Sequence, residues 1–358
     1  MSNNWQPIND ASVWGGSNLE RNRTWEFFLG DEHRAELEAA LASVNQAGLE
    51  LGAITQSNFP LPTLSATLRS ISAELKSGTG FSLLHGFPVD GHDYPDLEKM
   101  YWGLCAHLGR GVTQNGDAGL IHYVTDGKLR PNQGSRGVGA PRVTPLHIDL
   151  TDIASLLCVQ QAPDNPPSRV GSSSTLFNEI LTKHPAMLER LFQGFEWDRM
   201  EEHLDSESPS SGYLVPFFSM ADGQLSCRYN RAWIANALER NDGQVSEEIN
   251  DMFDVIDAIG EENCFEFPFQ RGDIQFCNNY TVMHGRAAHA VVEEEAQKRV
   301  LLRIWLEVPE FRAVTDEAIV RFGIGYHGKL GWSAADVASG RMEIPRPRRS
   351  DGALRLSD

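Results

Sequence analysis

The 358-residue sequence has few cysteines, and no two of them stand close together. A zinc-binding or redox-active cysteine pair is normally separated by two residues, and a disulfide framework needs an even number of cysteines at regular spacing. Neither pattern is present, which predicts reduced thiols and a cytoplasmic location. The five cysteines are Cys105, Cys158, Cys227, Cys264 and Cys277.

Long hydrophobic runs and basic residues are also scarce. The longest strongly apolar run, 153–159, is much shorter than the roughly 20 residues that cross a bilayer. The N-terminus has no basic stretch followed by an apolar one, so we expect no signal peptide. With 31 basic and 49 acidic residues the formal net charge is −18. Nucleic acid and anionic lipid both require a basic surface, so we expect neither as a partner.

Hydrophobic residues make up 41 % of the chain, enough for a sizeable core, which excludes a disordered or collagen-like protein. The first part, to about residue 110, is predicted to be mainly helical. Apolar residues recur at helical spacing there. The predicted helices cover 31–44, 64–75 and 97–108, with a short buried strand at 81–86.

Short apolar runs between turn residues dominate the remainder and predict strands. They cover 120–124, 153–159, 213–218, 225–229, 264–267, 274–277 and 300–307, with helical stretches at 184–194 and 245–259. Many short strands of this kind favour a β-sandwich or jelly roll, which with the helices makes an α+β fold. We expect loops at 114–144 and 163–174, and a flexible tail at 341–358.

The sequence Pro-Leu-His-Ile-Asp-Leu contains His147 and Asp149. Residues i and i+2 of a strand point to the same face, so the imidazole and the carboxylate would converge. A histidine, a carboxylate and a second, distant histidine form the facial triad that holds non-haem Fe(II). His284 follows 284 − 147 = 137 residues later, which we interpret as a position on an opposite strand of one barrel. Alone, the pair also fits a histidine beside an aspartate with no metal.

Two arginines follow on an apolar strand. Arg299 and Arg303 stand 15 and 19 residues after His284. An oxygenase that uses 2-oxoglutarate needs a fixed cation for the distal carboxylate, and a guanidinium supplies bidentate hydrogen bonds. Arg303 has the same parity as Arg299, so it could bind a second carboxylate, from 2-oxoglutarate or substrate, or pair with an acidic residue.

Together these motifs resemble the TauD/TfdA-type Fe(II)/2-oxoglutarate-dependent dioxygenases of the clavaminate synthase-like superfamily. The resemblance covers most of the chain. It rests on 80–88 (GFSLLHGFP), His147-x-Asp149, the acidic turn at 272–274, the NNxxxxHGR stretch at 278–286 and the RxxxRxWL stretch at 299–306. It implies a single domain over 1–358, with a double-stranded β-helix (jelly-roll) core flanked by helices.

The resemblance also implies roles for single residues. His147, Asp149 and His284 match the iron ligands, and Arg299 matches the position that binds 2-oxoglutarate. Thr175 aligns with a threonine that assists there, although the family usually has two glycines before it and this chain has Gly171-Ser-Ser-Ser. No catalytic residue is expected beyond the metal ligands.

Three further residues are candidates for substrate contacts, as Arg303 is. Arg286 and Asn279 flank His284, where they could orient ligands, contact substrate or only shape a turn. Tyr123 lies near the start of the long loop at 114–144, where it could touch substrate or be buried in the core.

The resemblance implies an enzyme that uses Fe(II), 2-oxoglutarate and O2 to oxidise a C–H bond of a small molecule, releasing succinate and CO2. The outcome would be hydroxylation, desaturation or ring closure, and a role in secondary metabolism is expected. Arginines inside an acidic protein favour a carboxylate or amino-acid-like substrate. Two alternatives stay open: an iron oxidase on the same fold that needs no 2-oxoglutarate, and a non-catalytic jelly-roll metal or ligand-binding protein. A homo-oligomer is also left open.

Overall fold

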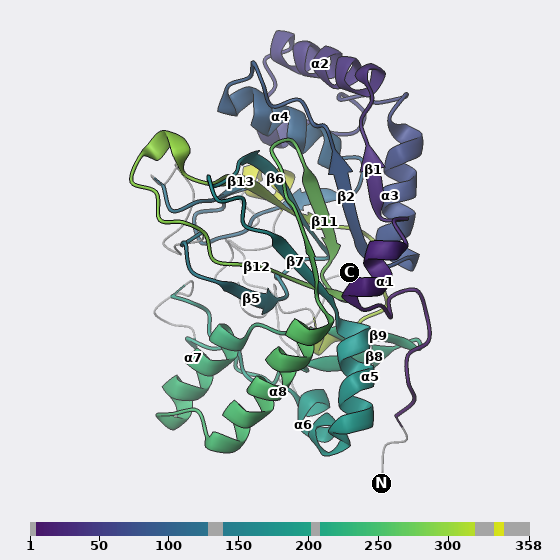
Figure 1. The fold of residues 1–358 in the computed structure, drawn as a ribbon. Coiled ribbons are helices and arrows are strands. Elements are labelled where there is room, and N and C mark those ends of the chain that lie inside the picture. The colour runs from purple at the N-terminus through teal and green to yellow at the C-terminus, as the bar shows by residue number, and fades with distance from the viewer. Residues whose placement is uncertain (1–4, 128–138, 202–207, 319–332, 340–358) are drawn as a thin grey trace.

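Two β-sheets face each other at the centre of the computed structural model, which describes residues 5–127, 139–201, 208–318 and 333–339 (Figure 1). The larger sheet has the order β1-β2-β11-β6-β13-β3, with β4 also paired to β13. Its strands are β1 Glu26–Phe28, β2 Phe81–His85, β3 Arg110–Val112, β4 His122–Val124, β6 Ile153–Gln160, β11 Ile274–Asn278 and β13 Val300–Glu307.

The smaller sheet has four strands in the order β10-β7-β12-β5. These are β5 Thr144–His147, β7 Ser168–Ser172, β10 Phe265–Phe267 and β12 Val282–Arg286. A separate hairpin pairs β8 Phe218–Ala221 with β9 Gln224–Cys227. Phe81 and Leu83 of the larger sheet pack against Val170 and Val282 of the smaller one, so one hydrophobic core lies between the sheets.

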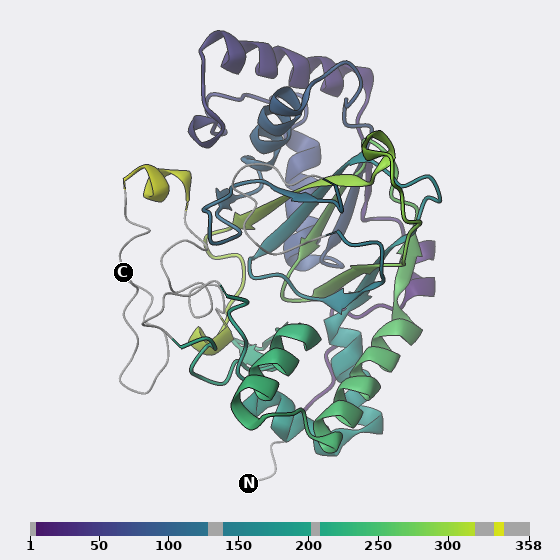
Figure 2. The same cartoon turned by 90° about the vertical axis from the view of Figure 1, so that its left-hand side faces the viewer.

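Helices cover the outer faces of both sheets (Figures 1 and 2). The N-terminal helices pack on the larger sheet through one apolar cluster, and α5 to α8 pack on the smaller sheet through another. The helices are α1 Gly16–Arg21, α2 Asp31–Gln46, α3 Ser65–Ser77, α4 Tyr94–Cys105, α5 Ser173–Lys183, α6 Leu188–Gln193, α7 Arg231–Asp242, α8 Glu247–Asn263 and α10 Ala334–Ala338.

Strand β13 shows how the sequence produces this layering. Successive side chains of a strand point to opposite faces. Leu302, Ile304 and Leu306 therefore join the cluster beneath the N-terminal helices. Leu301, Arg303 and Trp305 point the other way, toward the smaller sheet. An apolar run with two polar or amphipathic exceptions thus becomes a core strand that carries functional groups on one face only.

The predicted fold class is confirmed: helices flank a jelly-roll core made of two facing sheets. His147 and His284, however, do not lie on opposite strands of a barrel. They are direct partners on the neighbouring strands β5 and β12. The chain between them adds β6 and β11 to the larger sheet and forms helices α5 to α8 before it returns.

Two predictions of local structure are wrong. The stretch 163–174, taken as a loop for its proline and serine content, contains β7 and the start of α5. All five residues of β7 are buried between β10 and β12, where small side chains fit. The stretch 213–218 is not a strand, since β8 begins only at Phe218. The predicted tail at 341–358 lies outside the described residues.

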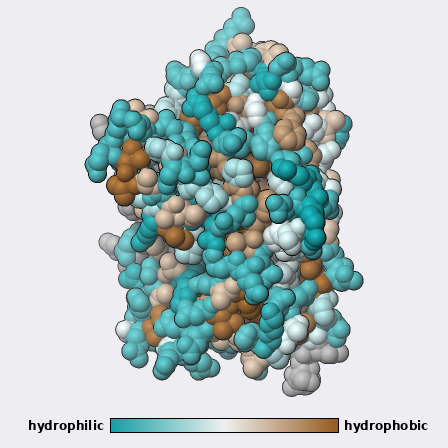
Figure 3. Space-filling model, in the orientation of Figure 1, coloured by the Kyte–Doolittle hydropathy of each residue, from teal (hydrophilic) through white to brown (hydrophobic). Residues whose placement is uncertain are grey.

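Hydrophilic residues cover most of the face seen in Figure 3, and hydrophobic residues form scattered patches on it. Among the described residues, no helix has the length and apolar character needed to cross a membrane.

Candidate metal centre

Three side chains meet where β5 and β12 run side by side. His147 ends β5, Asp149 follows two residues later, and His284 lies on β12 directly opposite His147. The Nε2 atoms of the two histidines each lie 3.7 Å from a carboxylate oxygen of Asp149. The two imidazole rings are 4.5 Å apart between centroids. The potential ligand atoms of all three residues lie within 4.8 Å of one another.

The protonation of His147 and Asp149 is suited to binding a cation. The Nδ1–H of His147 donates to the carbonyl of Pro145 at 2.9 Å, which leaves its Nε2 lone pair facing Asp149. Burial, reinforced by the charge of His284, lowers the pKa of His147 to about 4, so this imidazole is neutral at neutral pH. Burial alone would raise the pKa of Asp149, but Arg303 and both histidines hold it well below its usual range.

Two imidazoles and one carboxylate on one side of a site are the donor set of non-haem iron oxygenases, and they fit Fe(II). The Nδ1 atom of His284 is buried and has no hydrogen-bond partner among the described residues. Larger hollows exist elsewhere, for example beside Trp102 and His107. Within the described part of the chain, however, no other group of three such side chains has metal-binding geometry.

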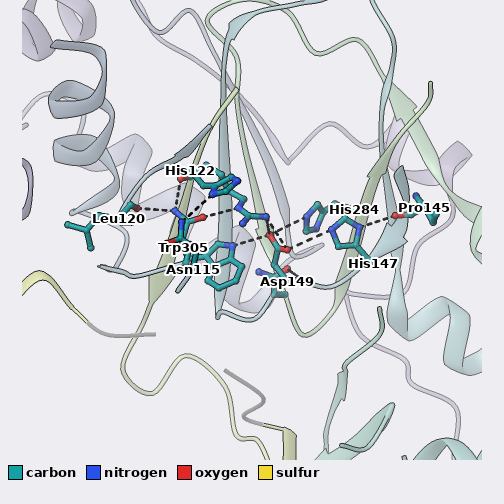
Figure 4. A network of polar contacts seen from close by, with 11 residues as sticks. Asn115, Leu120, His122, Pro145, His147, Asp149, His284 and Trp305 are labelled. Carbon is teal, nitrogen blue, oxygen red and sulfur yellow. Dashed lines mark hydrogen bonds and ion pairs between the residues drawn. The ribbon is translucent and has the colours of Figure 1, made fainter. Parts of the chain in front are cut away.

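A polar network surrounds Asp149 (Figure 4). The Nη1 atom of Arg303 lies 3.2 Å from Oδ2 and 3.4 Å from Oδ1 of Asp149. The indole N–H of Trp305 donates to the same Oδ2 at 3.0 Å. Gln114 holds Arg303 in turn, since its Oε1 accepts from Nε at 2.8 Å and its Nε2 donates to the Arg303 carbonyl at 2.7 Å.

Arg299 lines the same cavity as His147, His284 and Arg303. It is only 3 % exposed, and its Nε donates to Gln161 at 2.8 Å. Burial, together with the nearby charge of Arg286, lowers its pKa to about 10, so it remains a cation at neutral pH. Among the described residues, no carboxylate forms an ion pair with it. A buried charge without a counter-charge is costly, so the site is suited to an anionic ligand.

Arg286 also lines the cavity, two residues beyond His284 on the same face of β12. Its guanidinium donates to the carbonyls of Ala140 and Arg142 and to the hydroxyl of Thr144. It therefore fixes the segment that leads into β5, and its proximity makes the cavity more positive.

Besides Asp149, three of the predicted site residues are not part of the cavity lining. The Thr175 hydroxyl donates to the Trp14 carbonyl at 2.8 Å and accepts from its N–H at 3.0 Å. Tyr123 points into the outer cluster beneath the helices and donates to Glu98. Asn279 lies behind Asp149, where its side-chain oxygen accepts the Asp149 N–H at 3.3 Å.

Sequence reasoning missed three polar residues of the cavity, Thr144 on β5, Ser168 on β7 and Gln275 on β11. Ser168 carried no signal, because it stands in a serine-rich stretch that resembles a loop. Gln275 could have been found, because it is a polar residue within the apolar run of β11, where all five residues are buried. The contact between Trp305 and Asp149 was also missed, although the tryptophan is part of the RxxxRxWL stretch.

Facing sheets of a jelly roll with a His-x-Asp and distant His site define a non-haem iron oxygenase. The family model described as taurine catabolism dioxygenase TauD, TfdA family matches residues 44–305. The chain belongs to this family. Membership confirms the predicted class of enzyme, an Fe(II)- and 2-oxoglutarate-dependent dioxygenase.

Two curated proteins are similar over most of their length. FR-33289 synthase of Streptomyces rubellomurinus is 29 % identical over 315 residues, which cover 86 % of this chain and 92 % of that protein. Taurine hydroxylase-like protein SAT17 of Stachybotrys chartarum is 28 % identical over 312 residues, covering 83 % and 79 %.

Solved structures agree in fold. The non-haem iron oxygenase OrfP in complex with Fe, succinate and (3S)-hydroxy-L-Arg matches with a TM-score of 0.59 at 15 % identity, covering 79 % of this chain and 94 % of that one. Asparagine oxygenase in complex with Fe(II), 2S,3S-3-hydroxyasparagine and succinate matches with a TM-score of 0.58 at 14 % identity, covering 79 % and 93 %.

Proposed function

We propose that this protein oxidises a C–H bond of a small molecule, with Fe(II) held by His147, Asp149 and His284 and with 2-oxoglutarate anchored by Arg299. The observation that carries the proposal is that candidate metal ligands and a buried arginine lie close together. The His-Asp-His cluster, whose two histidines line the cavity, lies beside a buried cation, Arg299, that pairs with no carboxylate among the described residues. The first suits a dication and the second a dicarboxylate.

The side chains have separate tasks in this proposal. The two histidines and Asp149 provide three ligands on one side of the metal and leave the cavity side open. Arg299 binds the distal carboxylate of 2-oxoglutarate, with the Ser168 hydroxyl lining the same space. Arg286 supports the cavity wall through the carbonyls of the segment before β5. The metal supplies the reaction with O2, which none of these side chains performs.

We infer that the substrate is a carboxylate or an amino-acid-like compound. Three arginines line the cavity, and Asp149 pairs with only one of them, Arg303. The local potential therefore favours anionic groups although the whole chain is acidic. The similarity to amino-acid oxygenases, with hydroxyarginine or hydroxyasparagine in their structures, supports the same class. Hydroxylation is the simplest outcome, with desaturation and ring closure as variants of the same oxidation.

We also propose that the chain forms one catalytic domain and works in the cytoplasm. All five cysteines are unpaired, and four of them are buried, which suits a reducing compartment.

The test is anaerobic titration of the full chain with Fe(II) and then 2-oxoglutarate. The wild type is expected to develop the weak visible charge-transfer band of the metal chelate, and His147→Ala is expected to lose it. Arg299→Gln should keep Fe(II) binding but need about 10–100 times more 2-oxoglutarate for half of the band, because it loses charge-assisted hydrogen bonds to a carboxylate.

The matched control is Arg34→Gln, which removes a surface arginine of α2 that contacts Asp31 and the Leu29 carbonyl. It should titrate as the wild type does. A wild type without the band, or an undiminished band in His147→Ala, would refute the proposed site. Equal loss of Fe(II) and 2-oxoglutarate binding in Arg299→Gln would make Arg299 a structural residue.

A further inference from the structure

Asp149 differs from the two histidines in the number of donors around it. Oδ2 of Asp149 receives the Trp305 indole N–H at 3.0 Å and lies 3.2 Å from Nη1 of Arg303. For Oδ1, the Arg303 contact is longer, at 3.4 Å. The protein thus contacts one oxygen more closely than the other. A carboxylate that binds a metal through one oxygen has its second oxygen available for such donors.

Trp305 is well placed to act as a fixed donor. It is 1 % exposed and stands in the middle of β13, paired with Ala154 of β6 and Val112 of β3. A side chain on a central strand has its orientation set by packing on both sides, so its N–H direction is more constant than that of a loop residue. The guanidinium of Arg303 lies 4.8 Å from the centre of its ring, which adds a cation–π contact.

Arg303 is fixed from its other side. Gln114 accepts its Nε–H and also donates to the carbonyls of Arg303 and Leu120. Both donors to Asp149 therefore come from one strand, two residues apart, and neither depends on a surface segment. The indole of Trp305 has a single N–H donor, and Asp149 already accepts it.

We propose that Trp305 is a positioning residue of the metal centre: its indole N–H holds one oxygen of Asp149 and so presents the other to the metal. The inference rests on the proposed function, since it assumes that Asp149 is a metal ligand. Partners of this kind around a ligand typically change metal affinity by about 10–100-fold when they are removed.

The experiment compares Trp305→Phe with Trp102→Phe in the full chain. Both substitutions remove one buried indole N–H and keep an aromatic ring, but the N–H of Trp102 donates to the Ile54 carbonyl, away from the metal centre. Co(II) serves as an anaerobic spectroscopic probe in place of Fe(II). We expect Trp305→Phe to lose about 10–100-fold in Co(II) affinity and to show an altered visible ligand-field spectrum.

Trp102→Phe should keep both the Co(II) affinity and the spectrum of the wild type, although its thermal stability should fall by about as much as that of Trp305→Phe. Trp305→Met, which also lacks the donor but adapts its shape, should repeat the loss of affinity if Trp305→Phe folds poorly. Wild-type affinity and spectrum in the Trp305 variants, or equal loss in the Trp102 control, would overturn the inference.

Failure of the proposed function looks different in the same assay. If the wild type does not bind Co(II), or if His147→Ala binds it as tightly, the metal centre itself is refuted. If Co(II) binding depends on His147 and Asp149 but not on Trp305, only the positioning role is refuted.

Discussion

Thr175 and Ser168 show how two hydroxyls of one short stretch come to serve different purposes. Ser168 is on the face of β7 that looks into the cavity. Thr175 is in the first turn of α5, beyond the strand, where Ser172 caps the helix by accepting its N–H. Its hydroxyl is engaged by both backbone polar groups of Trp14. The threonine thus ties the N-terminal segment to the second helical layer.

Thr175→Val should therefore lower stability without changing the need for 2-oxoglutarate. The valine leaves the buried N–H and carbonyl of Trp14 without this partner, at a cost of about 1–3 kcal/mol in the free energy of unfolding. Urea unfolding and the anaerobic 2-oxoglutarate titration measure the two effects separately. Ser168→Ala is the matched comparison, with little change in stability and weaker 2-oxoglutarate binding. An increased 2-oxoglutarate requirement in Thr175→Val would instead favour the role that the family resemblance implied.

At the scale of elements, the pairing of β5 with β12 determines the distance between the two histidines. The register shifts between His284 and Arg286, at Gly285. A Cβ atom at Gly285 would lie 2.6 Å from the Thr144 carbonyl oxygen and 3.1 Å from the Pro145 carbonyl. Because these are backbone atoms, a side chain at Gly285 could be accommodated only if the two strands moved apart.

Gly285→Ala is expected to weaken metal binding and to destabilise the fold by about 1–3 kcal/mol, the usual cost of overpacking. Co(II) titration and thermal unfolding are the measurements. Gly15→Ala is the control, because its Cβ would meet only the Asn263 side chain, at 3.7 Å. Wild-type Co(II) affinity in Gly285→Ala would mean that the strand spacing does not control the site.

The sequence predicted the long apolar strand β13 well, but it did not predict strand β7 or helix α7. Strand β13 matches the predicted run 300–307, because a long apolar stretch of strand length has few other interpretations. Strand β7 was missed, since burial of serine and glycine depends on neighbours that the local sequence does not reveal. Helix α7 was missed for a related reason: only Ile234 and Ala237 are buried, too few for a clear periodicity.

For the site, the sequence indicated the three candidate ligands because their chemistry is restricted to few residue types. The same holds for Arg299, whose charge is unusual on an apolar strand. The hydrogen bond from Trp305 to Asp149 could not be predicted, because it depends on the register of β13 against its neighbours and on the path of the chain after β5. The spacing of residues along the chain reveals neither the strand register nor the path of the chain.

At the scale of the whole molecule, His85 joins three strands of the larger sheet at their ends. Its Nδ1 lies 2.7 Å from Asp273 and its Nε2 lies 3.1 Å from Glu26, while Phe28 stacks on the ring. Burial alone would lower the pKa of His85, but hydrogen bonds and charge from the two carboxylates raise it above its ordinary value.

This pKa shift predicts how stability depends on pH. A histidine whose folded pKa is raised contributes stability that is fully present below its unfolded value of about 6.5 and is lost as the pH rises through the folded pKa. The difference in unfolding free energy between wild type and His85→Gln should therefore be larger at about pH 6 than at about pH 9. Urea unfolding across this range measures it, and a difference independent of pH would contradict the assignment.

The direct pairing of His147 with His284 also constrains when the protein can acquire its metal. During synthesis the N-terminal part of a chain emerges first, so the ribosome must add 137 further residues before His147 meets its partner. Contacts of such long separation form late, because the intervening chain must be ordered first. A nascent chain that ends before β12 has no complete centre. On the proposed function, the three ligands can therefore bind iron together only after β12 has been synthesised and has paired with β5.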